Sequence, residues 1–126
     1  LKKMSEDYFF DSYAIIELIK GNPNYEFVKD NIIITGVMNM SEVYYALLLE
    51  NTEDFAESII KKLNVQIISL DLEMAARAAK FRYKNKKLFL SYIDCAGYIL
   101  AREDNLIFLT GDEGFKNMDN VKLIKK

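Results

Sequence analysis

Short apolar runs alternate along this chain with longer segments in which apolar residues recur every three or four positions. The short runs predict buried β-strands, and the periodic segments predict amphipathic helices. Strands are predicted over residues 8–10, 32–34, 65–68, 106–109 and 121–124. Helices are predicted over residues 12–20, 24–29, 39–49, 53–63, 71–87 and 91–102, with a short helical turn near Phe115.

Each of the first three predicted strands is separated from the next by predicted helices. Only a short helical turn separates the fourth strand from the fifth. A chain that alternates in this way needs crossover connections, which place the strands parallel in one sheet with helices on both faces. Its 126 residues suffice for one domain and are too few for two, and they contain no internal repeat or linker. The pattern therefore predicts a single α/β domain over residues 1–126 and leaves the strand order open.

Two absences in the composition limit the available chemistry. The chain has no histidine, which excludes nucleophiles activated by imidazole and zinc sites built from Cys and His. Its single cysteine, Cys95, excludes an internal disulfide, and its apolar surroundings predict a buried packing residue. A catalytic site must therefore use carboxylates, hydroxyls, Lys or Arg, or a hard cation.

Charge and hydropathy favour a cytoplasmic protein. The formal net charge of −2 differs from the strong positive charge of a typical nucleic-acid binder, although bound cations and local clusters can reverse the field at a site. The apolar runs are far shorter than the roughly 20 residues that span a bilayer, and no apolar signal core follows the first residues. We therefore expect a cytoplasmic location and no membrane partner.

Four acidic residues are expected at one edge of the sheet. Asp11 and Asp112 directly follow predicted strands, and Glu42 and Asp94 lie in the first turns of predicted helices. Helices that run antiparallel to the strands begin where the strands end, so all four side chains can meet at the carboxyl edge. Open parallel sheets carry their sites at this edge.

Each of these acids also has a purely structural explanation. Asp11 suits a helix N-cap and Asp112 suits a turn. Two segments match the capping box, Asn39-x-x-Glu42 and Ser91-x-x-Asp94. Taken one at a time, the four acids therefore do not establish a site.

Four carboxylates at one edge repel one another unless they protonate or bind a cation. Two carboxylates about 5 Å apart repel by roughly 3 kcal/mol at an effective dielectric of about 20. Sites built from oxygen ligands alone select Mg²⁺ or Mn²⁺. Such an ion keeps several water ligands in an open site, which suits metal-assisted hydrolysis of a phosphate ester.

A basic stretch, RAAKFRYKNKK, covers residues 77–87 and contains no acid. Phe81 and Tyr83 alternate in it with cations, as in a surface that contacts phosphates and stacks bases. The alternative is a solvated helix end whose aromatic rings pack inward. The candidate RNA-binding residues are Arg77, Lys80, Arg82, Lys84, Lys86 and Lys87.

Each of the four acids lies in a recognisable segment, and these segments occur in the order FFDSYAIIELIKGNP, MNMSEVYYALL, SYIDCAGYILA and LIFLTGDEGF. They resemble the four acidic motifs of the PIN domain, the nuclease fold of VapC-type toxins. The resemblance covers essentially the whole chain. The chain departs from the family pattern at Glu113-Gly114, where many relatives carry a basic or polar residue, and at the small residues Cys95-Ala96-Gly97.

The resemblance implies a three-layer α/β/α sandwich whose parallel sheet has five strands in the order 3-2-1-4-5. It also implies an endoribonuclease that uses one or two Mg²⁺ or Mn²⁺ ions to hydrolyse RNA to 5′-phosphate and 3′-hydroxyl ends. The implied catalytic and metal-binding residues are Asp11, Glu42, Asp94 and Asp112, and the implied site-orienting residues are Ser12 and Thr110. The implied partners are RNA, the cognate antitoxin of a toxin–antitoxin pair, and a second copy of the chain in a homodimer.

Two other functions remain open at this point. A receiver-type phosphoacceptor domain would have a similar length and fold class, with Asp71 after the third strand as the acceptor. Such a domain needs a pair of acids after its first strand, where this chain has Asp11 alone, and a lysine after its last strand, where Lys122 and Lys125 fit poorly. The other alternative is a PIN-like scaffold that binds partners without catalysis.

Overall fold

Five short parallel strands form the central sheet. The computed structural model of the protein describes residues 7–125. The strands are β1 (Tyr8–Phe10), β2 (Ile33–Thr35), β3 (Val65–Ile67), β4 (Ile107–Thr110) and β5 (Val121–Leu123). Every neighbouring pair is parallel, and the order is β3-β2-β1-β4-β5. This order confirms the expected α/β architecture and places β1 beside β4 at the centre of the sheet.

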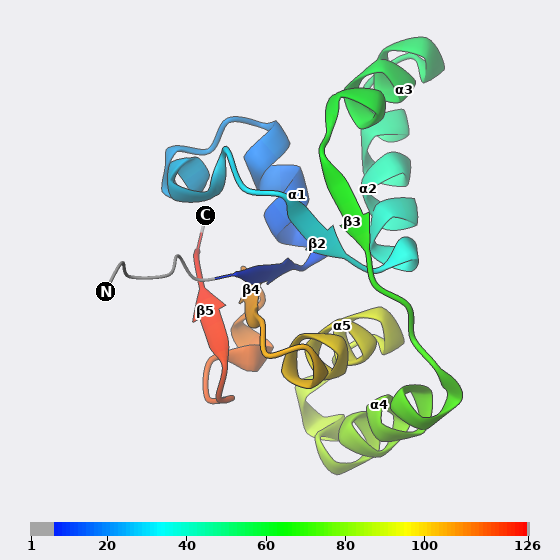
Figure 1. The fold of residues 1–126 in the computed structure, drawn as a ribbon, viewed down its shortest axis with the longest axis vertical. Coiled ribbons are helices and arrows are strands. Elements are labelled where there is room, and N and C mark those ends of the chain that lie inside the picture. Colours follow the sequence, from blue (N-terminus) through cyan, green and yellow to red (C-terminus); the bar gives the residue numbers. More distant parts are fainter. Residues whose placement is uncertain (1–6, 126) are drawn as a thin grey trace.

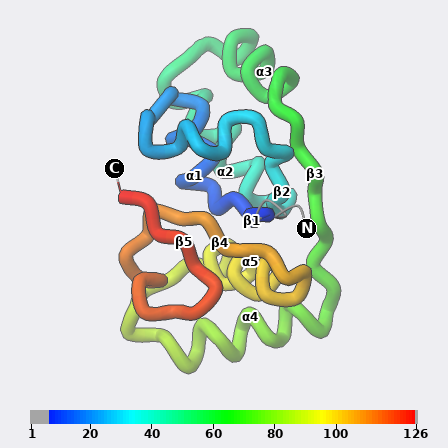
Figure 2. Tube along the Cα trace, turned by 60° about the vertical axis from the view of Figure 1, so that its left-hand side comes forward, coloured from blue at the N-terminus to red at the C-terminus, as the bar shows by residue number. Residues whose placement is uncertain are grey.

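Helices cover both faces of the sheet, as expected for parallel strands. The α-helices are α1 (Ser12–Ile19), α2 (Val37–Glu50), α3 (Glu53–Lys62), α4 (Leu72–Lys84) and α5 (Tyr92–Glu103). The short 3-10 helices are η1 (Pro23–Val28), η2 (Lys86–Leu88) and η3 (Glu113–Phe115). Helices α1 to α3 lie on one side of the sheet, and the packed pair α4 and α5 lies on the other (Figures 1 and 2). None of the helices among the described residues is long and apolar enough to cross a bilayer.

Two apolar cores lie between these layers, and the side chains of each strand alternate between them. In β1, Tyr8 and Phe10 pack with α1 and α2, whereas Phe9 packs with α5. In β4, Leu109 belongs to the first core and Phe108 to the second. The period of two along a strand therefore explains why almost every residue of β1 and β4 is apolar, since both faces of these strands are covered.

Cys95 is fully buried in the second core, as expected for a packing residue. Burial and the neighbouring charge of Asp94 raise the pKa of its thiol to about 11. The thiol therefore stays protonated at neutral pH, and Cys95 is unsuited to act as a nucleophile.

Three predicted helices differ most from the structure. Helix α2, predicted to begin at Asn39, begins at Val37 and has Gly36 as its N-cap. The predicted segment 24–29 is a 3-10 helix over Pro23–Val28, where proline occupies the first turn and the Asn22 side chain caps it. The long basic helix ends at Lys84 and is followed by the separate turn η2, because Asn85 leaves the helical conformation.

Candidate active site

The four acids occupy the carboxyl ends of β1 and β4 and the beginnings of two helices. Asp11 follows β1 directly and is the N-cap of α1. Asp112 follows β4 and is the N-cap of η3, with its Oδ1 accepting a hydrogen bond from the Gly114 amide (2.8 Å). Asp94 is the third residue of α5, and Glu42 is the sixth residue of α2. Glu42 therefore lies in the second turn of its helix, one turn later than predicted, because α2 begins earlier.

The Thr110 hydroxyl connects the two acids that follow the strands. It donates a hydrogen bond to Oδ2 of Asp11 (2.7 Å) and accepts one from the backbone amide of Asp112 (3.0 Å). The backbone amide of Asp11 also donates to the Leu109 carbonyl (3.0 Å), which continues the pairing of β1 with β4. Thr110 is fully buried. One hydroxyl with a fixed position therefore sets the orientation of Asp11 and the path of the chain at Asp112.

Ser12 connects Asp11 to Glu42 on the other side of the site. Its backbone amide donates to Oδ1 of Asp11 (2.8 Å), and its hydroxyl donates to Oε1 of Glu42 (2.5 Å). The same hydroxyl accepts a hydrogen bond from Nδ2 of Asn39 (2.9 Å). The predicted Asn39-x-x-Glu42 capping box is therefore wrong, because Asn39 lies inside α2 and its buried side chain orients Ser12 instead.

Asp94 combines a structural role with a position near Asp11. The predicted capping box is present: Ser91 donates its backbone amide to Oδ2 of Asp94 (3.0 Å), and the Asp94 amide donates to the Ser91 hydroxyl (3.0 Å). The charge of Asp94 nevertheless acts on Asp11 and raises its pKa. The cap therefore fixes Asp94 in the first turn of α5 at the same edge of the sheet.

Asp11 is the electrostatic centre of the site. Burial, and to a lesser degree the nearby charges of Asp94 and Glu42, raise the pKa of its carboxyl to about 7, although the hydrogen bonds from Thr110 and Ser12 lower it. None of the ion pairs within residues 7–125 includes Asp11, Glu42, Asp94 or Asp112. The negative charge of this edge is therefore not balanced by Lys or Arg, and a bound cation would stabilise it.

The donor set fits a hard cation, although the carboxylates do not form a closed cage. In the described part of the chain, no three Asp, Glu or Cys side chains converge closely enough to make a complete metal site by themselves. The site offers only oxygen atoms, several of them held by the hydrogen bonds above. An ion bound here would keep water among its ligands, as Mg²⁺ does.

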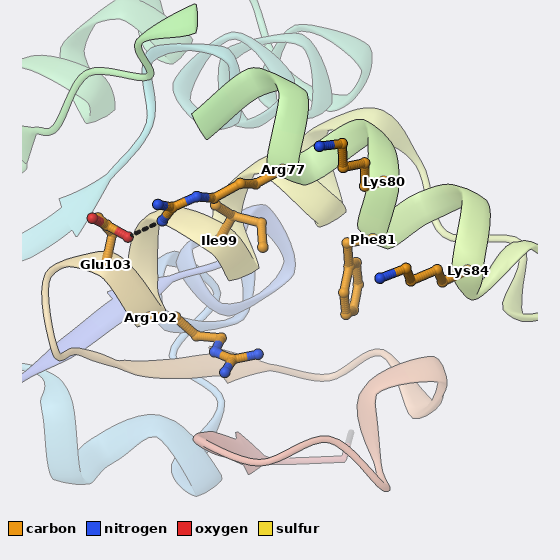
Figure 3. A pocket seen from close by; sticks show the side chains of 7 residues that line it. All are labelled: Arg77, Lys80, Phe81, Lys84, Ile99, Arg102 and Glu103. Atoms are coloured by element: carbon orange, nitrogen blue, oxygen red, sulfur yellow. Dashed lines mark hydrogen bonds and ion pairs between the residues drawn. The ribbon is translucent and has the colours of Figure 1, made fainter. Parts of the chain in front are cut away.

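The basic segment divides between two sides of the α4–α5 pair. Arg77, Lys80 and Lys84 line one side together with Arg102, around a cavity of about 470 Å³ that we call the basic cavity (Figure 3). Arg82 and Lys86 line a cleft on the other side. The remaining candidate, Lys87, is exposed in η2.

Contacts within the basic cavity reduce its charge. Arg77 forms ion pairs with Glu73 (2.8 Å) and Glu103 (2.6 Å), and Arg102 lies 3.9 Å from Asp119. Phe81 packs inward with its ring centroid 4.9 Å from that of Tyr98, whereas Tyr83 is exposed. The alternative in which the aromatic rings pack inward therefore holds for Phe81 and not for Tyr83.

The match to known proteins agrees with this geometry. The family model of the PIN domain matches residues 8–121, from the first residue of β1 to the first residue of β5. The chain belongs to the PIN domain family. No protein of curated function matches this PIN domain in sequence.

Solved structures show the same fold at low sequence identity. A toxin–antitoxin complex from Klebsiella pneumoniae contains a chain that is 18% identical, with a TM-score of 0.73 over 95% of this PIN domain and 100% of that chain. VapBC2 from Rickettsia felis, bound to a DNA fragment from its promoter, is 18% identical, with a TM-score of 0.68 over 94% of this chain and 97% of that one. VapC20 of Mycobacterium tuberculosis, a toxin that cleaves the sarcin–ricin loop, is 12% identical, with a TM-score of 0.66 over 80% of this chain and 85% of that one.

Replacing Thr110 with valine should weaken metal binding at neutral pH. Valine has the shape of threonine but removes the hydrogen bond that lowers the pKa of Asp11, so more of the carboxyl is protonated and a cation must displace that proton. Loss of a residue that orients a metal ligand typically costs about 10- to 100-fold in metal affinity. We expect a loss of this size in calorimetric titration with Mn²⁺ at pH 7.

The same loss should be smaller at pH 8.5, above the pKa of about 7 in the unmodified chain, because less of the Asp11 carboxyl is protonated there. Thr110→Ser retains the hydroxyl and is expected to bind Mn²⁺ nearly as the unmodified chain does. Equal Mn²⁺ affinities for Thr110→Val and the unmodified chain at pH 7 would contradict an orienting role for Thr110.

Proposed function

We propose that this PIN domain is a divalent-metal-dependent endoribonuclease that hydrolyses RNA to 5′-phosphate and 3′-hydroxyl ends. The observation that carries this proposal is the buried carboxylate of Asp11, held by two hydrogen bonds and coupled to Asp94 and Glu42 without a Lys or Arg ion pair. A protein gains nothing in stability from such an arrangement, because burial penalises the charge. The arrangement is useful where a cation binds.

In this proposal the four acids together bind one or two Mg²⁺ or Mn²⁺ ions, with different contributions. Asp11, Asp94 and Asp112 would bind the metal directly, and Glu42 would bind it directly or through water. When bound, the ion activates water and neutralises the charge that develops on the phosphodiester. Ser12 and Thr110 keep the Asp11 oxygens oriented through the hydrogen bonds described above.

The resting protonation of Asp11 gives metal binding a pH dependence. Because its pKa is about 7, a substantial fraction of the carboxyl is protonated at neutral pH in the metal-free protein. Metal binding must release that proton, so affinity for the ion should rise as the pH increases through 7.

We further propose that the domain is the toxin of a toxin–antitoxin pair, acts in the cytoplasm and forms a homodimer. One of the similar structures is described as a toxin–antitoxin complex, and another as a toxin. The α2–α3 surface carries exposed apolar side chains, Tyr45, Leu49 and Phe55, which suits a contact with another protein.

Asp71 is accounted for without a phosphoacceptor role. Its side chain caps α4 by accepting a hydrogen bond from the Met74 amide (2.8 Å). Such an N-cap is a sufficient reason for an acid at this position. Acid-labile phosphate on Asp71 after incubation with a phosphodonor would favour the receiver function instead.

The function is tested by incubating the purified protein with total RNA and with Mn²⁺, Mg²⁺ or EDTA. We expect discrete cleavage products with either metal and none with EDTA. The products should be substrates for a 5′-phosphate-dependent exonuclease. Cleavage that persists in EDTA, or products that carry 2′,3′-cyclic phosphates, would contradict the proposed chemistry.

A further inference from the structure

A cleft of about 290 Å³ lies between the end of α4 and the start of α5, and it carries three exposed aromatic rings. Tyr83 is 72% exposed, Phe89 is 92% exposed and Tyr92 is 66% exposed. Arg82 and Lys86 also line it, together with Ala79 and Leu90, and we call the three rings and two cations the aromatic cleft. Aromatic side chains gain stability by burial, so three exposed rings around one cleft indicate a surface for a ligand.

The backbone at Phe89 supports this interpretation. Phe89 has a φ of 55°, in the left-handed region, where glycine and asparagine are usually found. The other non-glycine residues with positive φ in the described chain are both asparagines, Asn105 and Asn120. A phenylalanine here is strained and almost wholly exposed, so neither backbone preference nor burial explains it.

The charges of the aromatic cleft select an anionic ligand. The Arg82 guanidinium lies 4.2 Å from the centroid of the Tyr92 ring, and its Nε donates to the Leu90 carbonyl (2.8 Å). The Lys86 ammonium lies 5.1 Å from the centroid of the Tyr83 ring. Residues 74–93 contain no acid, and neither cation belongs to an ion pair within residues 7–125. Exposed rings beside unpaired cations match a nucleotide, whose base stacks and whose phosphate is negative.

The aromatic cleft is adjacent to the acidic site. Tyr92 is the first residue of α5 and Asp94 the third. Arg82 and Asp94 also share Cys95 as a neighbour. The charge of Asp94 raises the pKa of the Cys95 thiol, and the charge of Arg82 lowers it. A nucleotide in the cleft would therefore place the neighbouring phosphates of its strand beside the acids.

The basic cavity does not share this position. Two of its residues, Arg102 and Glu103 (Figure 3), belong to the last turn of α5, whereas Asp94 belongs to the first. Of the six cations in the basic segment, Arg82 and Lys86 therefore line the cleft at the end of α5 that carries Asp94.

We propose that the aromatic cleft binds one unpaired base of the RNA substrate, stacked on Phe89 and Tyr92, with its phosphate against Arg82 and Lys86. Stacking in a duplex covers the base faces that these rings would contact, so the cleft selects single-stranded RNA. The choice of RNA as occupant rests on the proposed nuclease function.

Binding can be measured without cleavage, in EDTA, with a short single-stranded RNA that carries one 2-aminopurine. The chain has no tryptophan, so the fluorescence of the probe is observed with little protein background. We expect quenching of 2-aminopurine on binding, because the base stacks. The same RNA annealed to its complement should bind more weakly and show no further quenching.

Phe89→Gly is the decisive variant. Glycine suits the positive φ, so the free energy of unfolding should be unchanged or higher, while the ring that stacks the base is lost. A base–aromatic stack is worth roughly 5- to 150-fold in affinity, and we expect a loss of binding in this range together with loss of quenching. Phe55→Ala, which removes an exposed ring on α3 outside the cleft, is the matched control and should bind as the unmodified chain does.

The outcomes separate this proposal from the proposed function. If Mn²⁺-dependent cleavage occurs but Phe89→Gly binds and quenches normally, the cleft is not a base site and the nuclease function stands. If the base is quenched and Phe89→Gly abolishes this, but no metal supports cleavage, the cleft stands and the nuclease function fails. A change in oligomeric state on Phe89→Gly, measured by analytical ultracentrifugation, would instead assign the rings to a contact between copies of the chain and overturn the proposal.

Discussion

Asp112→Asn is expected to lower Mn²⁺-dependent RNA cleavage by more than about 100-fold while the fold remains intact. Residues that only orient a metal ligand typically contribute about 10- to 100-fold, so loss of a proposed direct ligand should exceed this range. Asparagine retains an oxygen that can accept the hydrogen bond from the Gly114 amide, so the cap of η3 should survive. Cleavage rates at saturating Mn²⁺ and thermal unfolding in EDTA measure the two effects separately.

Glu113→Gln is the matched control for this prediction. Glu113 is the next residue in the chain, is exposed, and forms an ion pair with Lys125 (2.6 Å). It lies outside the proposed ligand set, so its loss should leave cleavage nearly unchanged. Undiminished cleavage by Asp112→Asn, or an equal loss in both variants, would contradict the assignment of Asp112 as a ligand.

The fold and the places of the four acids could be predicted because both depend on local patterns. Apolar runs such as residues 106–109 indicate strands that are covered on both faces, and helical sequence between them requires parallel strands. Asp11 and Asp112 follow such runs directly, so their place at the carboxyl edge follows from the strand direction. The strand order came from the family resemblance, because hydrophobic periodicity carries no information about which strands are neighbours.

The contacts that organise the site were harder to predict because they join distant parts of the chain. Asn39 matches a capping box in the sequence, yet it lies inside α2 and donates to Ser12, 27 residues away. The sequence contains no local signal for this contact, because the segment Asn39-x-x-Glu42 fits both a helix N-terminus capped by Asn39 and a helix interior in which Asn39 contacts Ser12. Helical periodicity could have separated Arg82 and Lys86 from Arg77, Lys80 and Lys84, because residues three or four apart share a helix face.

The aromatic cleft shows a different limit of sequence analysis. Tyr92 and Phe89 lie beside apolar residues, and the simplest interpretation of such rings is that they pack in the core or at an interface. Their exposure depends on the backbone of residues 85–91, where η2 ends and Phe89 adopts a left-handed conformation. Conformational propensity does not predict a phenylalanine in the left-handed region of backbone conformation. The aromatic cleft that sequence patterns missed therefore lies where the backbone departs from the preference of its residue.

Asp11→Asn is expected to stabilise the metal-free protein at pH 8 while abolishing cleavage. Folding raises the pKa of Asp11 from 3.8 to about 7, so the folded state holds a proton that the unfolded chain releases between these values. The contribution of Asp11 to the free energy of unfolding therefore falls as the pH rises from about 4 to 7, and it is constant above pH 7. At about 1.4 kcal/mol for each pKa unit, the total is on the order of 4 kcal/mol.

Asparagine does not ionise, so the variant should lose this part of the pH dependence. Urea unfolding in EDTA at pH 4.5, 6 and 8 should show a difference between variant and unmodified chain that grows with pH, and parallel pH dependences would contradict the assignment. Mn²⁺ at about 1,000 times the dissociation constant should cancel this difference at pH 8, because the ion stabilises only the protein that binds it, by about 4.1 kcal/mol. A carboxylate that destabilises the empty protein, and whose cost a bound metal ion cancels, is expected of a residue retained for binding rather than for folding.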